Sequence, residues 1–155
     1  MPKNLYKNFR VNFSTLFGLG NLPLSGIIGT LFGIMISYIL SMFKTNQGFN
    51  LIVIVIITIL GTYSAHFTIS YYKKNDPSQI IIDEVVGSLI ASLFIKNSLQ
   101  NLALVFILFR LFDNLKPFPI SLIDKKTVTG WGIMADDILA GIFTCTCILA
   151  LNHFL

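Results

Sequence analysis

The stretch that decides the fold is residues 80–94, "IIIDEVVGSLIASLF". Two neighbouring carboxylates, Asp83 and Glu84, lie in an otherwise apolar run. An ionised side chain at the centre of a membrane helix costs about 2.5–3.5 kcal/mol, so such groups need compensation. A proton, a cationic side chain or a bound metal ion would each provide it. The rest of the sequence indicates which of the three applies.

The composition favours a helical membrane protein. Of the 155 residues, 54% are hydrophobic and only 12% are charged, and the mean hydropathy is +0.77. A soluble domain carries roughly 25% charged residues. A soluble domain with a large core is the alternative, but several apolar runs are too long for so small a domain. The runs are also continuous rather than alternating, which disfavours membrane strands.

Five apolar runs predict the helices. They cover Ser25–Phe43, Phe49–Tyr72, Ile80–Ile95, Leu99–Leu115 and Ile133–Leu151. A full span needs about 20 residues, so the first, second and fifth qualify, while the third and fourth are short. The short runs would sit partly below the bilayer face or line a crevice. We predict an all-α membrane bundle of about five to six helices, forming a single domain over 1–155 with a basic N-terminal segment at 1–15.

The positive charges predict the orientation, if all five runs cross. One side then holds eight basic residues: Lys3, Lys7, Arg10, Lys73, Lys74, Lys116, Lys125 and Lys126. The other holds Lys44 and Lys96, and Arg110 lies inside the fourth run. The richer side should be cytoplasmic. Because the basic residues lie between apolar runs, we interpret the net charge of +4 as a topology signal, not as a nucleic-acid surface.

All seven acidic residues fall at or near that same side. Besides Asp76 and Asp124 in loops, the sequence places Asp83 and Glu84 at the start of the third run, Asp113 at the end of the fourth, and Asp136 and Asp137 at the start of the fifth. Three helices therefore bring carboxylates to one depth near the cytoplasmic boundary. An alternative is that acids in a first helical turn only favour the helix dipole.

A divalent cation would relieve this crowding. Arg110 and Lys116 each lie three residues from Asp113 and can pair with it. The four remaining acids, Asp83, Glu84, Asp136 and Asp137, have too few cationic neighbours. Hard oxygen ligands in this number suit magnesium, or manganese as a substitute. Only two histidines occur, so a histidine-type zinc site is poorly supported.

Small residues and two loops add to this interpretation. Gly87 follows Asp83 by one turn, and Gly141 follows Asp137 by one turn, which would let the helices pack closely. The glycine-rich entry at 16–33, which includes Gly20, would let backbone N–H groups approach a phosphate. The segment "KPFPI" at 116–120 predicts an extended turn that leaves Lys116 beside the acids. Ordinary helix packing and a simple helix stop are the alternatives.

Chemistries based on a nucleophilic side chain find little support in the sequence. Cys145 and Cys147 lie in the last apolar run, diverge by about 200° on a helix, and are not followed by a phosphate-binding loop with arginine. No D-x-D pair follows a predicted strand, and no serine–histidine constellation is visible. The N-terminus lacks the short apolar core and cleavage site of a signal peptide.

Three ordered motifs resemble one family. "DPSQIIIDEVVG", "RLFDNLKPFPI" and "GWGIMADDILAG" resemble phosphatidylglycerophosphatase A, a bacterial membrane phosphatase, over nearly the whole chain from Leu16 to beyond Gly141. His66 also falls where the family carries a histidine. Soluble relatives look like an all-helical bundle with one central helix surrounded by the others. The glycine loop departs from the family's P-G-T-x-G-S pattern, because it reads "SGIIGT" at 25–30.

The resemblance implies a magnesium-dependent removal of phosphate from phosphatidylglycerophosphate, giving phosphatidylglycerol in glycerophospholipid biosynthesis. It implies a multi-pass protein of the bacterial cytoplasmic (inner) membrane with its active site facing the cytoplasm. The implied catalytic residues are Asp83, Glu84, Asp113, Asp136 and Asp137, of which all but Asp113 would be metal ligands. The implied substrate-binding residues are Arg110, Lys116, Gly20 and His66. The sequence leaves open whether a carboxylate or water attacks the phosphorus, and it does not indicate the oligomeric state.

Two further hypotheses come from other classes of protein. Carboxylates inside a membrane also mark ion paths, so a small cation carrier or transporter subunit is a rival. Such a path would need polar groups continuing across the membrane, and the third and fifth runs offer mainly Ser88, Ser92, Thr144 and Thr146. A purely structural membrane subunit would leave the clustered acids unexplained.

Overall fold

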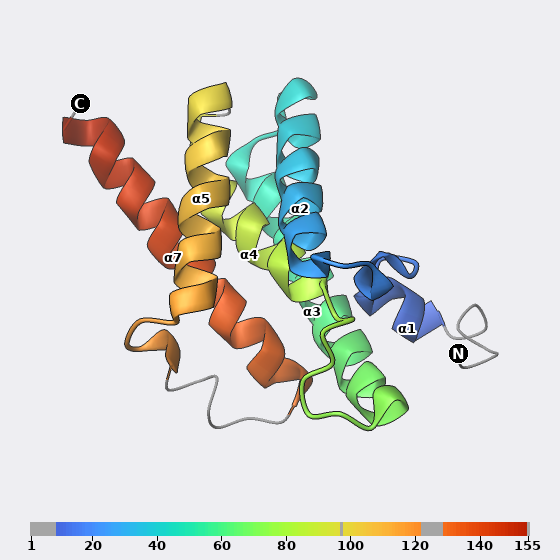
Figure 1. Cartoon of the computed structure of the whole chain (residues 1–155). Coiled ribbons are helices and arrows are strands. Elements are labelled where there is room, and N and C mark those ends of the chain that lie inside the picture. Colours follow the sequence, from blue (N-terminus) through green and yellow to red (C-terminus); the bar gives the residue numbers. More distant parts are fainter. Residues whose placement is uncertain (1–8, 97, 122–128, 155) are drawn as a thin grey trace.

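The structure is a computed structural model that describes residues 9–96, 98–121 and 129–154. Its elements are α1 (Phe9–Ser14), a 3-10 turn η2 (Leu19–Asn21), α2 (Ser25–Met42), α3 (Gln47–Tyr72), α4 (Ile82–Ser92), α5 (Leu99–Leu115) and α7 (Gly130–Phe154), shown in Figure 1. Helices are the only regular secondary structure in these described residues, which confirms the predicted all-α class.

Polar caps fix where two long helices begin. The side chain of Asn46 accepts a hydrogen bond from the backbone N–H of Phe49 at 2.8 Å, at the start of α3. The side chain of Ser98 accepts one from Asn101 at 3.2 Å, at the start of α5. These caps satisfy backbone donors that the first turn leaves without a helical partner.

The third apolar run forms a shorter helix than its hydropathy suggests. The predicted run covers Ile80–Ile95, whereas α4 covers Ile82–Ser92. The backbone N–H of Ile81 donates to the carbonyl of Ser14 at 3.0 Å. The residue before α4 is therefore bonded to the end of α1 and is not part of the helix. By contrast, α5 matches its predicted run at both ends.

The short helix α4 is the centre of the bundle. It contacts α2, α3, α5 and α7, and most of its side chains are buried, including Val85, Val86 and Leu89. The central helix implied by the family resemblance is therefore present. Because α4 is enclosed on several sides, its polar residues must find partners within the protein rather than in lipid or water.

Glycines let α2 and α7 approach this central helix. A Cβ atom added to Gly29 of α2 would come within 2.7 Å of the carbonyl oxygen of Ile81. A Cβ on Gly33 would collide with the hydroxyl of Ser88. On the opposite contact, a Cβ on Gly141 of α7 would collide with the carbonyl oxygen of Gly87. Backbone therefore packs against backbone, as small residues allow in membrane helices.

Three helices of the described chain, α2, α3 and α7, are long and apolar enough to cross a membrane. With 11 residues, α4 is only about 16 Å long and cannot cross a hydrocarbon core of about 30 Å by itself. The supposition that all five runs cross fully is therefore wrong for the third, and the expectation that it is too short is confirmed. Figure 1 nevertheless places the loop after α2, the start of α5 and the C-terminus at one end of the bundle, as predicted.

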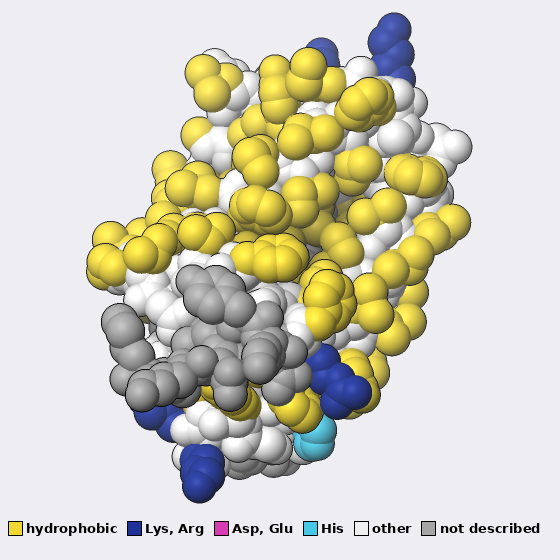
Figure 2. Space-filling model, turned by 90° about the vertical axis from the view of Figure 1, so that its right-hand side faces the viewer, with side chains coloured by type: hydrophobic (Ala, Val, Ile, Leu, Met, Phe, Trp, Pro, Cys, Tyr) yellow, Lys and Arg dark blue, Asp and Glu magenta, His cyan; other side chains and the backbone are white. Residues whose placement is uncertain are grey.

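The surface of the molecule fits a bilayer. Large apolar side chains such as Leu31, Ile52 and Ile59 are about half exposed or more. Figure 2 shows a broad hydrophobic face with basic side chains at both of its ends. A broad apolar face of this kind is typical of surfaces that contact lipid or another protein. Together with the three long apolar helices, this face is consistent with a membrane protein.

Candidate active site

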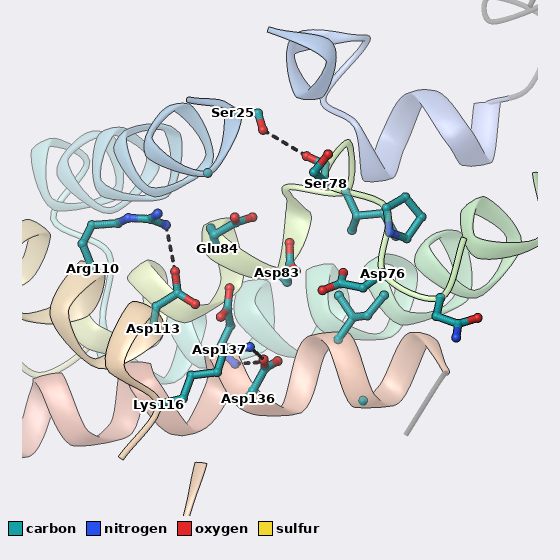
Figure 3. Close-up of a pocket in the computed structure, with 16 residues that line it drawn as sticks. Ser25, Asp76, Ser78, Asp83, Glu84, Arg110, Asp113, Lys116, Asp136 and Asp137 are labelled. Carbon is teal, nitrogen blue, oxygen red and sulfur yellow. Dashed lines mark hydrogen bonds and ion pairs between the residues drawn. The ribbon is translucent and has the colours of Figure 1, made fainter. Parts of the chain in front are cut away.

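A pocket of about 340 Å³ opens at the end of the bundle where α4 begins and α5 ends. Its charged lining residues are Asp76, Asp83, Glu84, Arg110, Asp113, Lys116, Asp136 and Asp137. Figure 3 shows that the acidic side chains from α4, α5 and α7 surround a common space. The structure thus confirms that three helices bring carboxylates to one depth.

Helix α4 presents its acids from its first turn. Asp83 and Glu84 follow the N-terminal residue Ile82, and both lie on the pocket wall. Helix α7 contributes Asp136 and Asp137 about two turns after its start at Gly130, and both are buried. The two helices cross closely one turn further along each of them, so the two acidic pairs face the same pocket.

Three of these carboxylates converge on one point. Asp83, Glu84 and Asp137 each offer an oxygen, and the three oxygens lie within 4.8 Å of one another. Asp83 Oδ1, Glu84 Oε2 and Asp137 Oδ2 are buried and have no hydrogen-bond partner among the described atoms. A buried, unpartnered carboxylate oxygen is costly. The arrangement therefore requires a cation or protons at this point.

The pKa of Asp83 shows the same cost of burying these charges. Its helix, α4, is not one of the three spanning helices. Burial raises the pKa of Asp83 well above its usual value, and the neighbouring Glu84 and Asp137 carboxylates raise it further. Both causes disfavour the charged form of the acid. A divalent cation bound among these oxygens would favour the charged form again.

Two cations flank the three convergent carboxylates, each held by an acid. Arg110 Nη1 donates to Asp113 Oδ2 at 2.9 Å, as its spacing of three residues predicts. Lys116 Nζ donates to Asp136 Oδ2 at 2.7 Å. The prediction that Lys116 pairs with Asp113 therefore overlooked a partner on another helix, since α7 brings Asp136 within reach.

The end of α5 directs Lys116 into the pocket. Lys116 is the C-terminal cap of α5 and has left-handed backbone angles, φ 43° and ψ 58°. Its backbone N–H still donates to the carbonyl of Phe112 at 2.9 Å. Pro117 follows and cannot continue the helix. A non-glycine residue in this region costs of order 1–3 kcal/mol.

The start of α2 forms a further part of the wall and lies within the glycine-rich segment 16–33, which the sequence predicts could approach a phosphate. Ser25 and Gly26 line the pocket, and the hydroxyl of Ser25 donates to the carbonyl of Ser78 at 3.0 Å. A Cβ on Gly26 would lie 2.6 Å from Glu84 Oε1 and 3.1 Å from Arg110 Nη1. The glycine-rich character of residues 16–33 was the available signal, but it did not indicate which glycine faces the acids.

Two predicted substrate-binding residues lie elsewhere in the described structure. Gly20 packs against the backbone of Gln79, and a Cβ there would collide with the Gln79 carbonyl oxygen. His66 lines a separate groove with Tyr63 and Trp131, between α3 and the start of α7. Neither residue belongs to the lining of the acidic pocket. Gly20 is explained by the close packing of two chain segments, and α3 holds His66 outside the site.

The residues present suit a hard divalent cation. The donor set consists of carboxylate oxygens from Asp83, Glu84 and Asp137, which is the ligand chemistry that magnesium and manganese prefer. The unpartnered buried oxygens are the structural observation that supports this fit. Asp136, also predicted as a ligand, contacts Lys116 through Oδ2 and is not one of the three convergent carboxylates.

These features define a class: a helical membrane protein with a buried carboxylate site, flanked by an arginine and a lysine, at one end of the bundle. The profile of the family described as phosphatidylglycerophosphatase A matches residues 12–152. The chain belongs to this family of phosphatases and is an enzyme.

Named relatives agree with the family match. A Haemophilus influenzae protein named phosphatidylglycerophosphatase A is 36% identical over 141 residues, covering 90% of this chain and 86% of the relative. The Escherichia coli protein of that name is 34% identical over 139 residues, with coverage of 88% and 80%. A Bacteroides thetaiotaomicron protein, 30% identical over 141 residues with coverage of 86% and 87%, is provisionally named a phosphatidylinositol-3-phosphatase. No solved structure matches.

Proposed function

We propose that this enzyme removes the terminal phosphate from phosphatidylglycerophosphate at the cytoplasmic face of a bacterial inner membrane, in a magnesium-dependent reaction of phospholipid biosynthesis. The observation that carries the proposal is the convergence of Asp83, Glu84 and Asp137 beside two tethered cations. A Lewis acid and cationic donors both stabilise the negative charge that develops when a phosphate monoester is cleaved.

The acids of α4 and α7 would hold the metal ion. Asp83, Glu84 and Asp137 supply the oxygen ligands, and manganese would substitute for magnesium because it accepts the same donors. When bound, the metal ion polarises the phosphoryl group and lowers the pKa of a bound water. In its absence, the three carboxylates would repel one another at close range.

The cationic side chains would bind the phosphoryl oxygens. Arg110 has a planar guanidinium that can bridge two oxygens, and one of its nitrogens is already fixed by Asp113. Lys116 lies on the pocket wall with its ammonium fixed by Asp136. Donors positioned before the reaction stabilise developing negative charge without reorganising during it.

The position of the site suits a lipid substrate. The pocket lies at one end of the bundle, and the apolar surface begins beside it, with exposed Phe17 and Leu24 in the segment between α1 and α2. The polar head of a lipid can therefore reach the acids while its acyl chains remain in the bilayer. The side that holds the site also carries most of the basic residues, which favours a cytoplasmic location.

The rival function, a cation carrier, has weaker support. A path across the membrane would have to use the polar residues beyond the site, such as Ser88, Ser92 and Thr144. Their hydroxyls donate to carbonyls of their own helices, at 2.7 Å to Glu84, 2.8 Å to Ser88 and 2.8 Å to Ala140 respectively. These hydroxyls are few and follow the backbone of their own helices, whereas a cation path needs a continuous series of polar ligands across the membrane.

Phosphate release from defined lipids tests the proposal. Purified protein in mixed micelles would be given phosphatidylglycerophosphate, with phosphatidylinositol-3-phosphate and phosphatidic acid as competing substrate classes. We expect release from the first lipid, its loss with a chelator, and its return with magnesium or manganese. Release that persists in the chelator would contradict the metal assignment, and release only from another lipid would contradict the substrate.

Alanine at Asp83 or Asp137 provides the matched mutational test. Each variant should lose phosphate release while still inserting into the membrane, because each removes one of the three convergent oxygens. Asp76 lines the same pocket on an exposed loop and serves as the control position. Activity that survives both core substitutions would overturn the site.

A further inference from the structure

Two neighbouring acids on α7 have different surroundings. Asp136 Oδ2 accepts a hydrogen bond from Lys116 Nζ at 2.7 Å, and Asp136 Oδ1 accepts one from the backbone N–H of Asp137 at 3.2 Å. Asp137 Oδ2 is buried without a partner and belongs to the convergent set of three carboxylates. The adjacent pair "DD" at 136–137 therefore does not act as one unit.

Helix geometry explains the division. Consecutive residues on an α-helix point about 100° apart, so two neighbouring acids can face different partners. Asp137 faces α4, where Asp83 and Glu84 open their helix. Asp136 faces the end of α5, where Lys116 closes that helix, as Figure 3 shows.

The Lys116 ammonium needs a partner that fixes its position. A lysine ammonium sits on a flexible stem and carries about 2 kcal/mol of rotamer entropy. The Lys116 side chain is 27% exposed and that of Asp136 only 10% exposed, so the contact is partly shielded from water. An ion pair so placed keeps its strength better than a surface pair. Asp136 thus restricts where the ammonium can lie along the pocket wall.

We propose that Asp136 is a positioning residue, which holds the Lys116 ammonium toward a phosphate monoester, and that Asp137, Asp83 and Glu84 alone take the divalent cation. This inference rests on the proposed function for the identity of the anion. It divides the acids into a set that binds the metal ion and a set that holds cationic side chains. Asp113 belongs to the second set because it holds Arg110 in the same way. Metal affinity and phosphate affinity should then depend on different acids.

Binding measurements on the wild type, three single variants and one double variant test the division without turnover. Purified wild type, Asp136→Asn, Asp137→Asn and Lys116→Met would be titrated with manganese, followed by electron paramagnetic resonance, and with inorganic phosphate in the presence of manganese. We expect Asp137→Asn to weaken manganese binding by about tenfold or more, the loss usual for metal-site changes. Asp136→Asn and Lys116→Met should leave manganese affinity within about twofold of wild type.

Phosphate binding should respond in the opposite manner. Asp136→Asn and Lys116→Met should each weaken phosphate binding by roughly tenfold, as expected for one charged hydrogen bond. The double variant should be no weaker than Lys116→Met alone, because Asp136 acts through the lysine. With the lipid substrate, both single variants should raise KM while keeping the magnesium dependence of wild type.

Three results would overturn the division. Manganese binding by Asp136→Asn as weak as that of Asp137→Asn would make Asp136 a ligand. Effects on phosphate affinity that multiply in the double variant would make the two residues independent. Should Asp136→Asn fail to fold, Lys116→Met, at the partly exposed end of α5, tests the same coupling from the other side, and unchanged phosphate binding there would contradict it. A wild type that binds both ions in this pattern but releases no phosphate from lipid would contradict the proposed function alone.

Discussion

Gly87 of α4 and Gly141 of α7 lie in backbone contact, so close that a Cβ on Gly141 would collide with the carbonyl oxygen of Gly87. Each glycine follows a carboxylate of the site by four residues, Asp83 on α4 and Asp137 on α7. Because four residues make about one turn, the crossing point of the helices fixes the separation of the two acids. The site is therefore built one turn from a close backbone contact of the central helix.

Alanine at Gly87 should destabilise the fold and impair the site together. Its Cβ would lie 2.6 Å from Phe109 Cζ and 2.7 Å from the carbonyl oxygen of Asp137. The aromatic ring is fully buried and cannot move freely, so we expect a loss of about 1–3 kcal/mol in the free energy of unfolding. Thermal unfolding in detergent and manganese affinity would both be measured, and both should fall.

Gly48 supplies the matched control for that substitution. It lies in the first turn of α3, and the nearest atom to its added Cβ, Asn46 Oδ1, is 3.4 Å away. Alanine there should leave stability equal or slightly higher, since alanine favours helix more than glycine does. Equal losses at Gly48 and Gly87 would contradict the argument from close packing.

Asparagine at Asp137 should stabilise the protein when no divalent cation is present. It removes one of three buried carboxylates that crowd each other, and its amide can donate to a neighbouring acid. We expect a higher Tm than wild type in a chelator and little further change on adding magnesium. Wild type should instead gain Tm with magnesium, because binding to the folded state stabilises it.

Asp76→Asn is the control for this gain. The residue lines the same pocket but is exposed on the loop between α3 and α4. Its replacement should change the Tm in chelator very little and should keep the rise with magnesium. If Asp137→Asn instead had a lower Tm than wild type in chelator, the Asp137 carboxylate would not destabilise the metal-free protein, and the prediction would be wrong.

Alanine at Gly26 should reduce activity with little loss of fold. The added Cβ would lie 2.6 Å from Glu84 Oε1 and 3.1 Å from Arg110 Nη1, both ends of side chains that can shift. Displacing a ligand and a phosphate donor by about 1 Å can cost up to 10²-fold in rate. We expect kcat/KM to fall by at least about tenfold at nearly unchanged Tm, while Ser25→Ala, which loses only its bond to Ser78, should change kcat/KM less.

The helix positions and the depth of the acids could be predicted from the sequence, because both depend on local pattern. Hydropathy locates α5 to the residue, and the placement of Asp83 and Glu84 in a first turn follows from where the apolar run starts. The contact between Arg110 and Asp113 could also be predicted, since a spacing of three on one helix brings them together.

Contacts between helices could not be predicted in the same way. The pairing of Lys116 with Asp136 depends on how α5 and α7 sit side by side, which no spacing in the sequence reports. The same holds for Gly26, which faces Glu84 only because α2 crosses α4 there. The family resemblance predicted His66 near the site because the family has a histidine at this position. In the structure, α3 directs it to a different groove.

Cysteine labelling would test the orientation on which a cytoplasmic site depends. Lys44 and Lys73 lie just beyond opposite ends of α3, whose 26 residues make a helix of about 39 Å, enough to separate them across a bilayer. Both are exposed, so a cysteine at either position should react with a maleimide that cannot cross membranes. The native Cys145 and Cys147 would be replaced by alanine in both forms.

We expect Lys44→Cys to react in intact spheroplasts and Lys73→Cys only in inverted vesicles. The reason is that the side of Lys73 carries the excess of basic residues. Loops rich in lysine and arginine stay in the cytoplasm. Phosphate release by the inverted vesicles, from lipid added outside, should accompany the labelling of Lys73→Cys, because the acids lie toward that end of the bundle. The reverse labelling pattern would place the site on the outer face, and labelling of both positions from one side would mean that α3 does not cross.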